Sequence, residues 1–135
     1  MRDRLALRET ADLPLIAPSA PQGLRVVING AFHAAGIRPR VEMEVNRLAM
    51  AKTLVRDGLG CMFLAQSGLR GRVDEASIGY ARIHDPVISW TMSVAVRRHG
   101  QPTLAARLLM RMIESLVAGL VRDKEWHGEV LAGKR

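Results

Sequence analysis

The chain has 135 residues, of which 48% are hydrophobic and 24% charged, and it contains one cysteine. This is the composition of a single soluble domain, and it excludes a membrane-spanning protein, because no apolar run approaches the roughly 18 residues that a span requires. One cysteine also excludes a small secreted fold held by internal disulfides. The start at Met1–Arg4 has no apolar signal segment, so we expect a cytoplasmic protein.

The net charge of +7 is spread evenly along the sequence. Residues 1–50, 51–100 and 101–135 carry 7, 7 and 6 basic groups against 5, 4 and 4 acidic ones. Proteins that bind nucleic acid usually concentrate basic residues on one helix face or arm. The few aromatic residues are isolated, so no platform for stacking bases is visible. We interpret the charge as an arginine-rich solvated surface and keep a small basic nucleic-acid-binding α/β protein as the alternative.

The first predicted elements are a strand and a helix. Residues 1–12 are charged and weakly patterned, and we expect a connector or a ragged start there. Leu13–Ala17 predicts a buried strand, and Pro18–Gly23 is a loop rich in proline, serine and glycine. From Leu24 the apolar residues keep helical spacing until Gly36, where the helix is expected to end.

A second strand and helix follow, and then a third strand. Val41–Val45 alternates apolar and charged residues, which predicts a strand with one wet face. Asn46 is expected to cap a helix over residues 48–55, with Gly58 at its end. Gly60–Ala65 has no polar side chain, as expected for a strand covered on both faces.

The second half predicts two strands and a long helix. Residues 66–77 are compatible with a short helix. Ile78–Ile83 and Val87–Val96 predict strands separated by a His-Asp-Pro turn, and residues 104–121 carry a single apolar stripe typical of an amphipathic helix. Residues 123–135 are expected to be a polar tail. The order of elements predicts an α/β fold with a mainly parallel sheet flanked by helices.

No pattern in the sequence indicates catalysis. A Gly-Leu-Gly triplet follows a helix rather than a strand, which is the wrong context for a phosphate. Cys61 lies in the most apolar segment, where a buried thiol is inert, and the histidines lack metal-ligand spacing. Glu42 and Glu44 share one strand face and are expected to meet solvent near Arg38 or Arg40. We therefore expect no enzyme, no metal and no cofactor.

Polar residues follow the first two predicted strands. Ser19 lies in the loop after the first strand, and Asn46-Arg47 follows the second. In open α/β sheets ligands bind beyond the carboxyl ends of the strands, and a helix N-terminus offers free amides to an anion. The sequence therefore predicts that Ser19 and Asn46 line one cleft for a small, anionic molecule.

Four segments keep an order and spacing that together are fairly specific. They are LPLIAPSAPQGLR (13–25), the helix end AAGI (34–37), VEMEVNRLAMAKTLVRDGLGCMFLA (41–65) and TMSVAVRRHGQPTLAARLLMRMI (91–113). Together they resemble the effector-binding domain of LysR-type transcriptional regulators, from Leu13 to about Val121. One departure is Ala65, which stands where the family commonly has proline.

The resemblance implies a fold of the type 2 periplasmic-binding-protein kind. In that family a winged helix precedes two α/β subdomains. Residues 13–65 resemble the second subdomain (βαβαβ), and residues 66–122 resemble the return into the first (β-β-α). Nothing in the chain resembles the winged helix, so we expect a truncated ligand sensor that contacts DNA only through a winged helix absent from this chain.

The resemblance also implies which residues contact a co-inducer. They lie in two loops and on the crossing strand, and are Ser19, Ala20, Gln22, Asn46, Arg47, Phe63 and Leu64. The helix after Gly23 resembles the one that pairs subunits in family dimers, so a homo-oligomer is expected. No membrane partner is implied.

Overall fold

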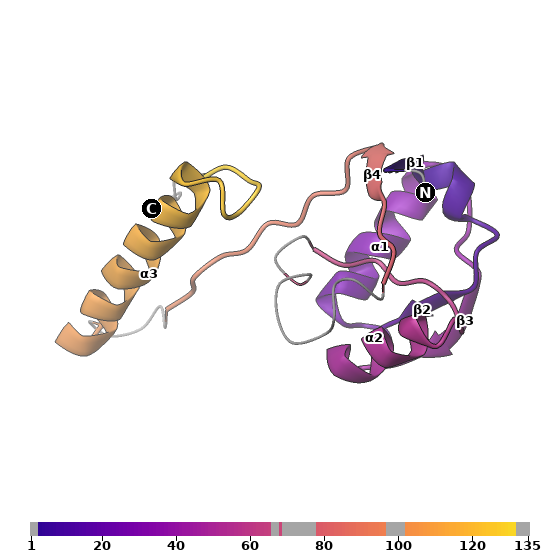
Figure 1. Cartoon of the computed structure of the whole chain (residues 1–135). Coiled ribbons are helices and arrows are strands. Elements are labelled where there is room, and N and C mark those ends of the chain that lie inside the picture. The colour runs from indigo at the N-terminus through magenta and orange to yellow at the C-terminus, as the bar shows by residue number, and fades with distance from the viewer. Residues whose placement is uncertain (1–2, 66–67, 69–77, 97–101, 132–135) are drawn as a thin grey trace. The chain divides into compact units, whose positions relative to one another are not determined.

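The computed structural model describes residues 3–65, 68, 78–96 and 102–131 (Figure 1). The chain divides into two compact units. The first comprises residues 1–65 and 69–90, and the second comprises residues 66–68 and 91–135. The short helix considered for residues 66–77 lies outside the described residues, apart from Gly68.

Two parallel strands, β2 (Leu15–Ala17) and β3 (Val41–Glu44), form the centre of the first unit. All three residues of β2 are buried, at 2% exposure or less, as the run of apolar residues predicts. Along β3 half-buried and exposed residues alternate, which confirms the strand with one wet face. The pairing aligns Ala17 with Glu44, so both strands end at the same edge.

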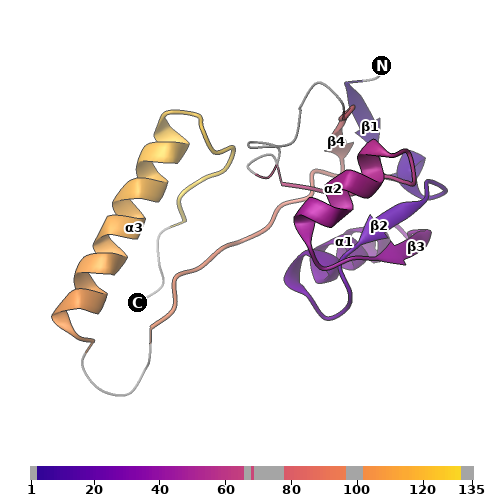
Figure 2. The same ribbon diagram turned by 60° about the horizontal axis from the view of Figure 1, so that its bottom comes forward.

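Helices cover the two faces of this strand pair, α1 (Gly23–Ala34) on one and α2 (Leu48–Arg56) on the other. Figure 2 shows α2 in front of β2 and β3, with α1 behind them. Each helix is followed by a glycine with positive φ, Gly36 at 67° and Gly58 at 78°, where a side chain would be strained. Both predicted helix ends are therefore confirmed.

The buried core lies between α1 and β2. Ile28 and Phe32 of α1 pack against Leu15 and Ala17 of β2, and Leu7 is the fifth buried residue of this cluster. Because the side chains of a strand alternate between its faces, Leu15 and Ala17 project to the same side. This packing positions the start of α1, and with it the loop that follows β2.

The start of the chain forms regular structure, whereas a connector or a ragged start was expected. Residues Arg4–Ala6 form β1, which pairs in parallel with β4 (Arg82–Asp85), and Leu7–Thr10 form a short 3₁₀ helix, η1. Leu7 is completely buried in the core. The sequence did not predict β1 and η1, because each is too short to show a periodic pattern of apolar residues and charged residues flank them.

The strand expected at Gly60–Ala65 is reduced to a single parallel bridge between Leu15 and Cys61. Cys61 donates its N–H to Pro14 O and accepts from Ile16 N, at 2.9 and 2.8 Å. The next backbone donor of the β2 chain on this side would be residue 18, and Pro18 has no N–H. The ladder ends there, and residues 62–64 are half-buried and Ala65 is exposed, rather than covered on both faces.

Two further predictions were wrong in the later part of the chain. The strand predicted at Ile78–Ile83 starts only at Arg82 and continues through His84 and Asp85, the first two residues of the predicted turn. The strand predicted at Val87–Val96 is not formed, because no described strand lies beside it to complete a ladder. Its alternating apolar side chains, such as Met92 and Val94, are exposed.

The second unit contains the long helix α3 (Leu104–Arg122), as predicted. The Thr103 hydroxyl caps it by accepting from Ala106 N at 3.2 Å. The helix ends before Asp123, and Lys124 has a φ of 57°, so the tail does not extend it. No α3 residue is buried against the parts of the chain that the structure describes.

Candidate functional site

Two loops meet at the edge where β2 and β3 end. The first, residues 18–22, leads from β2 into α1, and the second, residues 45–47, leads from β3 into α2. The strands are parallel and in register at their last residues, so their carboxyl ends lie together. Val45 extends the pairing by donating its N–H to Ala17 O at 2.9 Å. The loops that the sequence singled out are therefore adjacent.

A hydrogen bond joins the two loops through the residues predicted to lie together. The Ser19 N–H donates to Asn46 Oδ1 at 2.9 Å. This confirms that Ser19 and Asn46 are neighbours, although it corrects the role given to Asn46. The residue that precedes α2 is Arg47, whose guanidinium has no acceptor atom with which to cap the helix. The Asn46 side chain, which could cap it, bonds to the neighbouring loop instead.

An arginine that the sequence reasoning missed lies between the same loops. Arg25, in the first turn of α1, donates to Pro18 O at 2.8 Å and to Glu44 Oε1 at 2.9 Å. Its side chain is 13% exposed. A basic residue in a first helical turn opposes the helix dipole, and that was the signal available in the sequence. Such a residue needs a local acidic or carbonyl partner, and Glu44 and Pro18 provide both.

The N-termini of α1 and α2 both point to this edge without side-chain caps. Neither N-cap residue, Gln22 of α1 or Arg47 of α2, makes a capping bond with its side chain, and neither helix has an acidic residue in its first turn. The unpaired amides at a helix start carry partial positive charge and favour an anion. Arg47 is exposed at the start of α2 and adds a full positive charge. The edge also carries Glu44, which pairs with Arg25.

The comparisons with known proteins point to one family. A family model described as "LysR substrate binding domain" matches residues 2–118. The chain belongs to this family. The match confirms the resemblance and the α/β fold class, and it makes the chain a ligand-sensing domain of the LysR type.

Three curated relatives are transcriptional regulators by name. The HTH-type transcriptional regulator BbuR of Bordetella bronchiseptica is 25% identical over 90% of this chain and 38% of its own length. The probable RuBisCO transcriptional regulators of Emiliania huxleyi and Cyanophora paradoxa are 30% and 29% identical, over 62% and 75% of this chain. They are covered over 28% and 32% of their lengths, so the chain spans about a third of these relatives. No solved structure matches the chain.

Phe63 and Leu64 of this LysR-type domain follow the bridge at Cys61. Cys61 pairs with β2 in the parallel sense, on the side away from β3, and the described residues after it form no further ladder with β2. The Phe63 ring meets Phe32 edge to face, with centroids 5.8 Å apart. Phe63 thus belongs partly to the core, and its contact with an effector stays a prediction, as does that of Leu64, Ala20, Gln22 and Arg47.

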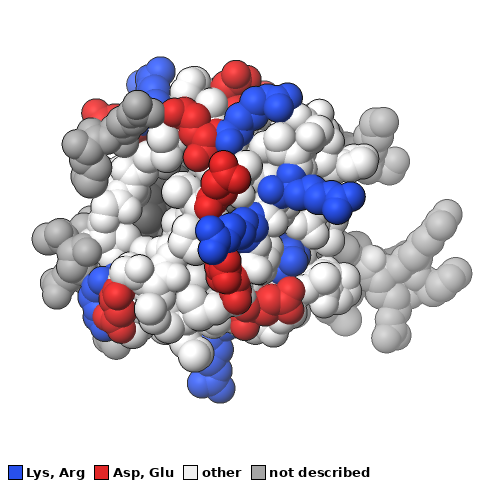
Figure 3. All heavy atoms as spheres, turned by 90° about the vertical axis from the view of Figure 1, so that its right-hand side faces the viewer, with Lys and Arg blue, Asp and Glu red and all other residues white. Residues whose placement is uncertain are grey.

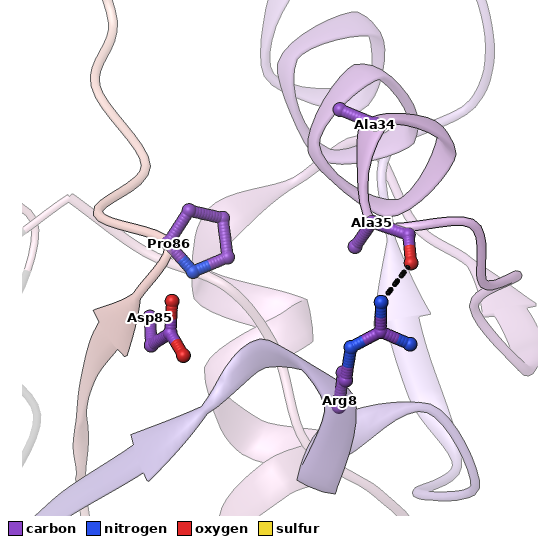
Figure 4. Close-up of a pocket in the computed structure, with 5 residues that line it drawn as sticks. All are labelled: Arg8, Ala34, Ala35, Asp85 and Pro86. Carbon is purple, nitrogen blue, oxygen red and sulfur yellow. Dashed lines mark hydrogen bonds between the residues drawn. The ribbon is translucent and has the colours of Figure 1, made fainter.

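Two hollows among the described residues of the first unit lie away from these loops. Figure 4 shows one of about 310 Å³ in which Arg8 donates to Ala35 O at the end of α1, opposite Asp85 and Pro86. A second, of about 560 Å³, is lined by Asp3, Arg4, Tyr80 and Arg82. Neither is lined by Ser19 or Asn46, so the adjacency of these two residues is established and the cleft itself stays a prediction.

The other residues weighed for chemistry have structural surroundings. Glu42 meets solvent beside Arg40, at 2.6 Å, whereas Glu44 pairs with Arg25 rather than with Arg38 or Arg40. Cys61 is half-buried, its Sγ lies 3.5 Å from Pro14 O, and burial raises the pKa of its thiol, which suits an inert side chain. No group of three potential metal ligands occurs among the residues that the structure describes.

The charges on the first unit are mixed in sign. Figure 3 shows lysine and arginine side chains interspersed with acidic ones on the face in view, in accord with the even spread along the sequence. Nothing in the family match favours the nucleic-acid-binding alternative. None of the described helices is long and apolar enough to cross a bilayer.

Proposed function

We propose that this domain binds a small anionic effector at the edge formed by residues 18–22 and 45–47, with Ser19 and Asn46 in contact with it. The hydrogen bond between these two residues carries the proposal, because it brings both loops within reach of one metabolite-sized molecule. The uncapped starts of α1 and α2 and the exposed Arg47 supply the positive potential that an anion requires. Ala20, Gln22, Phe63 and Leu64 complete the proposed site.

Titration of the ¹⁵N-labelled chain with small molecules tests this proposal. We would use a panel of carboxylates (acetate, succinate, citrate and benzoate) with their neutral amides as controls. We expect saturable shifts of the Ser19, Ala20 and Asn46 signals with at least one carboxylate and none with its amide. Shifts confined to other parts of the chain, or none with any member, would contradict the proposal.

Variants sharpen the same experiment. Replacing Asn46 by alanine removes the acceptor that holds the Ser19 loop, and we expect binding about tenfold weaker, which corresponds to about 1.4 kcal/mol. The matched control is Thr53→Ala, because Thr53 is an exposed residue of α2 whose hydroxyl bonds only within the helix, to Ala49 O. This control should leave the affinity unchanged.

The proposal extends to the absence of catalysis and to DNA. The chain acts by binding alone, and any DNA contact of the regulator is made through a winged helix outside the 135 residues. The even charge spread supports this, since specific duplex binding requires an element that enters a groove. We expect no sequence-selective shift of a duplex by this chain at physiological salt in a gel assay. A selective shift would favour the nucleic-acid alternative.

A homo-oligomer is the remaining part of the proposal. The second unit supports it, because α3 exposes large apolar side chains along most of its length, among them Leu104, Leu109 and Met112 at 65%, 57% and 68%. Contiguous exposed apolar surface of this kind marks an association site. The domain is proposed to act in the cytoplasm, where a LysR-type regulator meets both its effector and DNA.

A further inference from the structure

Arg25 makes contacts with three separate points of the first unit. Its Nη1 donates to Pro18 O at 2.8 Å and to Glu44 Oε1 at 2.9 Å, and its Nε donates to Asn29 Oδ1 at 3.2 Å. The side chain is 13% exposed, whereas that of Glu44 is 49% exposed. The guanidinium fork can serve several acceptors at fixed angles, which a lysine ammonium cannot.

The peptide unit between Pro18 and Ser19 is held at both of its ends. Its carbonyl oxygen accepts from Arg25, and its N–H, on Ser19, donates to Asn46 Oδ1. A planar peptide fixed through both polar groups cannot rotate about its flanking bonds without breaking one of them. Arg25 therefore determines which way the Ser19 N–H points.

The same arginine also holds the end of β3. Glu44 is the last residue of that strand and lies two positions before Asn46. The contacts close a ring that runs from Arg25 to the Pro18–Ser19 peptide, then to Asn46, and through the backbone to Glu44 and back. Because Glu44 pairs with the guanidinium, Arg25 is engaged inside the protein rather than presented to an incoming anion.

From this ring we infer that Arg25 is a positioning residue, which fixes the spacing and orientation of the two loops and thereby sets effector affinity without touching the effector. The second half of this statement rests on the function proposed above. Arg25 keeps the loops ordered before a ligand binds, so that binding does not lose the conformational entropy of ordering them. The cation that meets the effector is then Arg47.

Hydrogen exchange of single amides in the whole chain, without any ligand, tests the positioning role. In Arg25→Met we expect the Ser19 amide to exchange at least tenfold faster, while the Ile16 amide, bonded to Cys61 O in the sheet, changes by less than threefold. The Asn46 side-chain NH₂ signals should shift as well. If Ser19 and Ile16 accelerate by the same factor, Arg25 only stabilises the fold, and the inference is wrong. No change at Ser19 would equally overturn it.

Two milder variants keep the test decisive if Arg25→Met fails to fold. Arg25→Lys retains the charge but loses the fork, and we expect an intermediate acceleration at Ser19. Glu44→Gln retains the length but removes the charge, and we expect a smaller effect that is still confined to the loops. The positioning role would be contradicted if, in both variants, the Ser19 amide exchanged at the wild-type rate or accelerated by the same factor as the Ile16 amide.

Titration with succinate and benzoate then separates this inference from the proposed function. If either carboxylate shifts the wild-type Ser19 signal, we expect Arg25→Lys to bind it at least fivefold more weakly, while the exchange rate at Ile16 stays within threefold of wild type. Undiminished affinity in that variant would overturn the link to the effector. If no carboxylate or amide in the panel shifts Ser19 in the wild type, the proposed function fails, whereas the exchange data still decide the positioning role.

Discussion

At the scale of single residues, Gly60 is the described glycine at which an added side chain would meet the closest neighbour. A Cβ at this position would lie 2.6 Å from Pro14 O and 3.1 Å from Ile16 Cγ1. Since Pro14 O belongs to the backbone and Ile16 is buried, neither can move aside easily. We expect Gly60→Ala to lower the free energy of unfolding by about 1–3 kcal/mol, measured by urea denaturation.

Gly30 is the matched control for that substitution. It lies in α1, where an added Cβ would meet no atom within 4 Å. Alanine is favoured over glycine in a helix by about 1 kcal/mol, so Gly30→Ala should raise the free energy of unfolding. If both alanine variants were equally stable, the close approach of Gly60 to β2 would be refuted.

Cys61 gives a prediction about pH. Burial raises the pKa of its thiol above the ordinary value of 9.0, so the folded chain keeps its proton at a pH where the unfolded chain has begun to lose it. Stability from this group is therefore complete below pH 9 and declines as the pH rises through 9 toward the folded pKa. At pH 9 we expect iodoacetamide to alkylate the native thiol several-fold more slowly than the urea-unfolded one. Equal rates would show that the thiol is not shielded.

At the scale of the element, α1 connects the core to the proposed site. Phe32 is 1% exposed, belongs to the core cluster and meets Phe63 edge to face. We expect Phe32→Ala to lower the free energy of unfolding by about 3–5 kcal/mol. Val26, in the same helix and 57% exposed, is the control, and Val26→Ala should stay within about 0.5 kcal/mol of wild type. Similar losses in both variants would show that α1 is not anchored through Phe32.

The elements differ in how far the sequence determines them. For α1 and α2 the apolar spacing and the glycines at 36 and 58 act within a few residues, so their ends could be predicted. Strand pairing depends on what lies alongside. The segment after Gly60 has the composition of a strand, but its pairing with β2 stops at one bridge because Pro18 has no N–H to donate. Val87–Val96 has no described strand beside it.

In the candidate site, the contact between the two loops could be predicted from the sequence, whereas the contacts of individual side chains could not. The adjacency of Ser19 and Asn46 follows from parallel strands that end together, which the order of elements already implies. The contact between Arg25 and Glu44 could not be predicted, because these residues are 19 positions apart and meet only through the packing of α1 on β2. Nor could the crossing of the Asn46 side chain, since a residue of this type before a helix usually caps it.

At the scale of the whole molecule, the exposed stripe of α3 predicts self-association. Leu109 and Met112 lie three positions apart on one helix face and are 57% and 68% exposed. We expect light scattering at micromolar concentration to give a mass above that of one chain, and the double variant Leu109→Gln/Met112→Gln to reduce it. Glu114→Gln, an exposed polar change on the same helix, is the control. A monomer at every concentration would contradict the proposed oligomer.

The pairing of β1 with β4 has a consequence for how the protein is made. Arg4 and Arg82 are register partners although 78 positions separate them in the chain. During synthesis at about 5–20 residues per second, the first strand emerges several seconds before the strand that completes its sheet. Contacts between such distant residues also slow folding, because the long loop must close before any pairing is gained. The nascent chain thus carries an unpaired strand edge, and β1 reaches its final place only after β4 has been made.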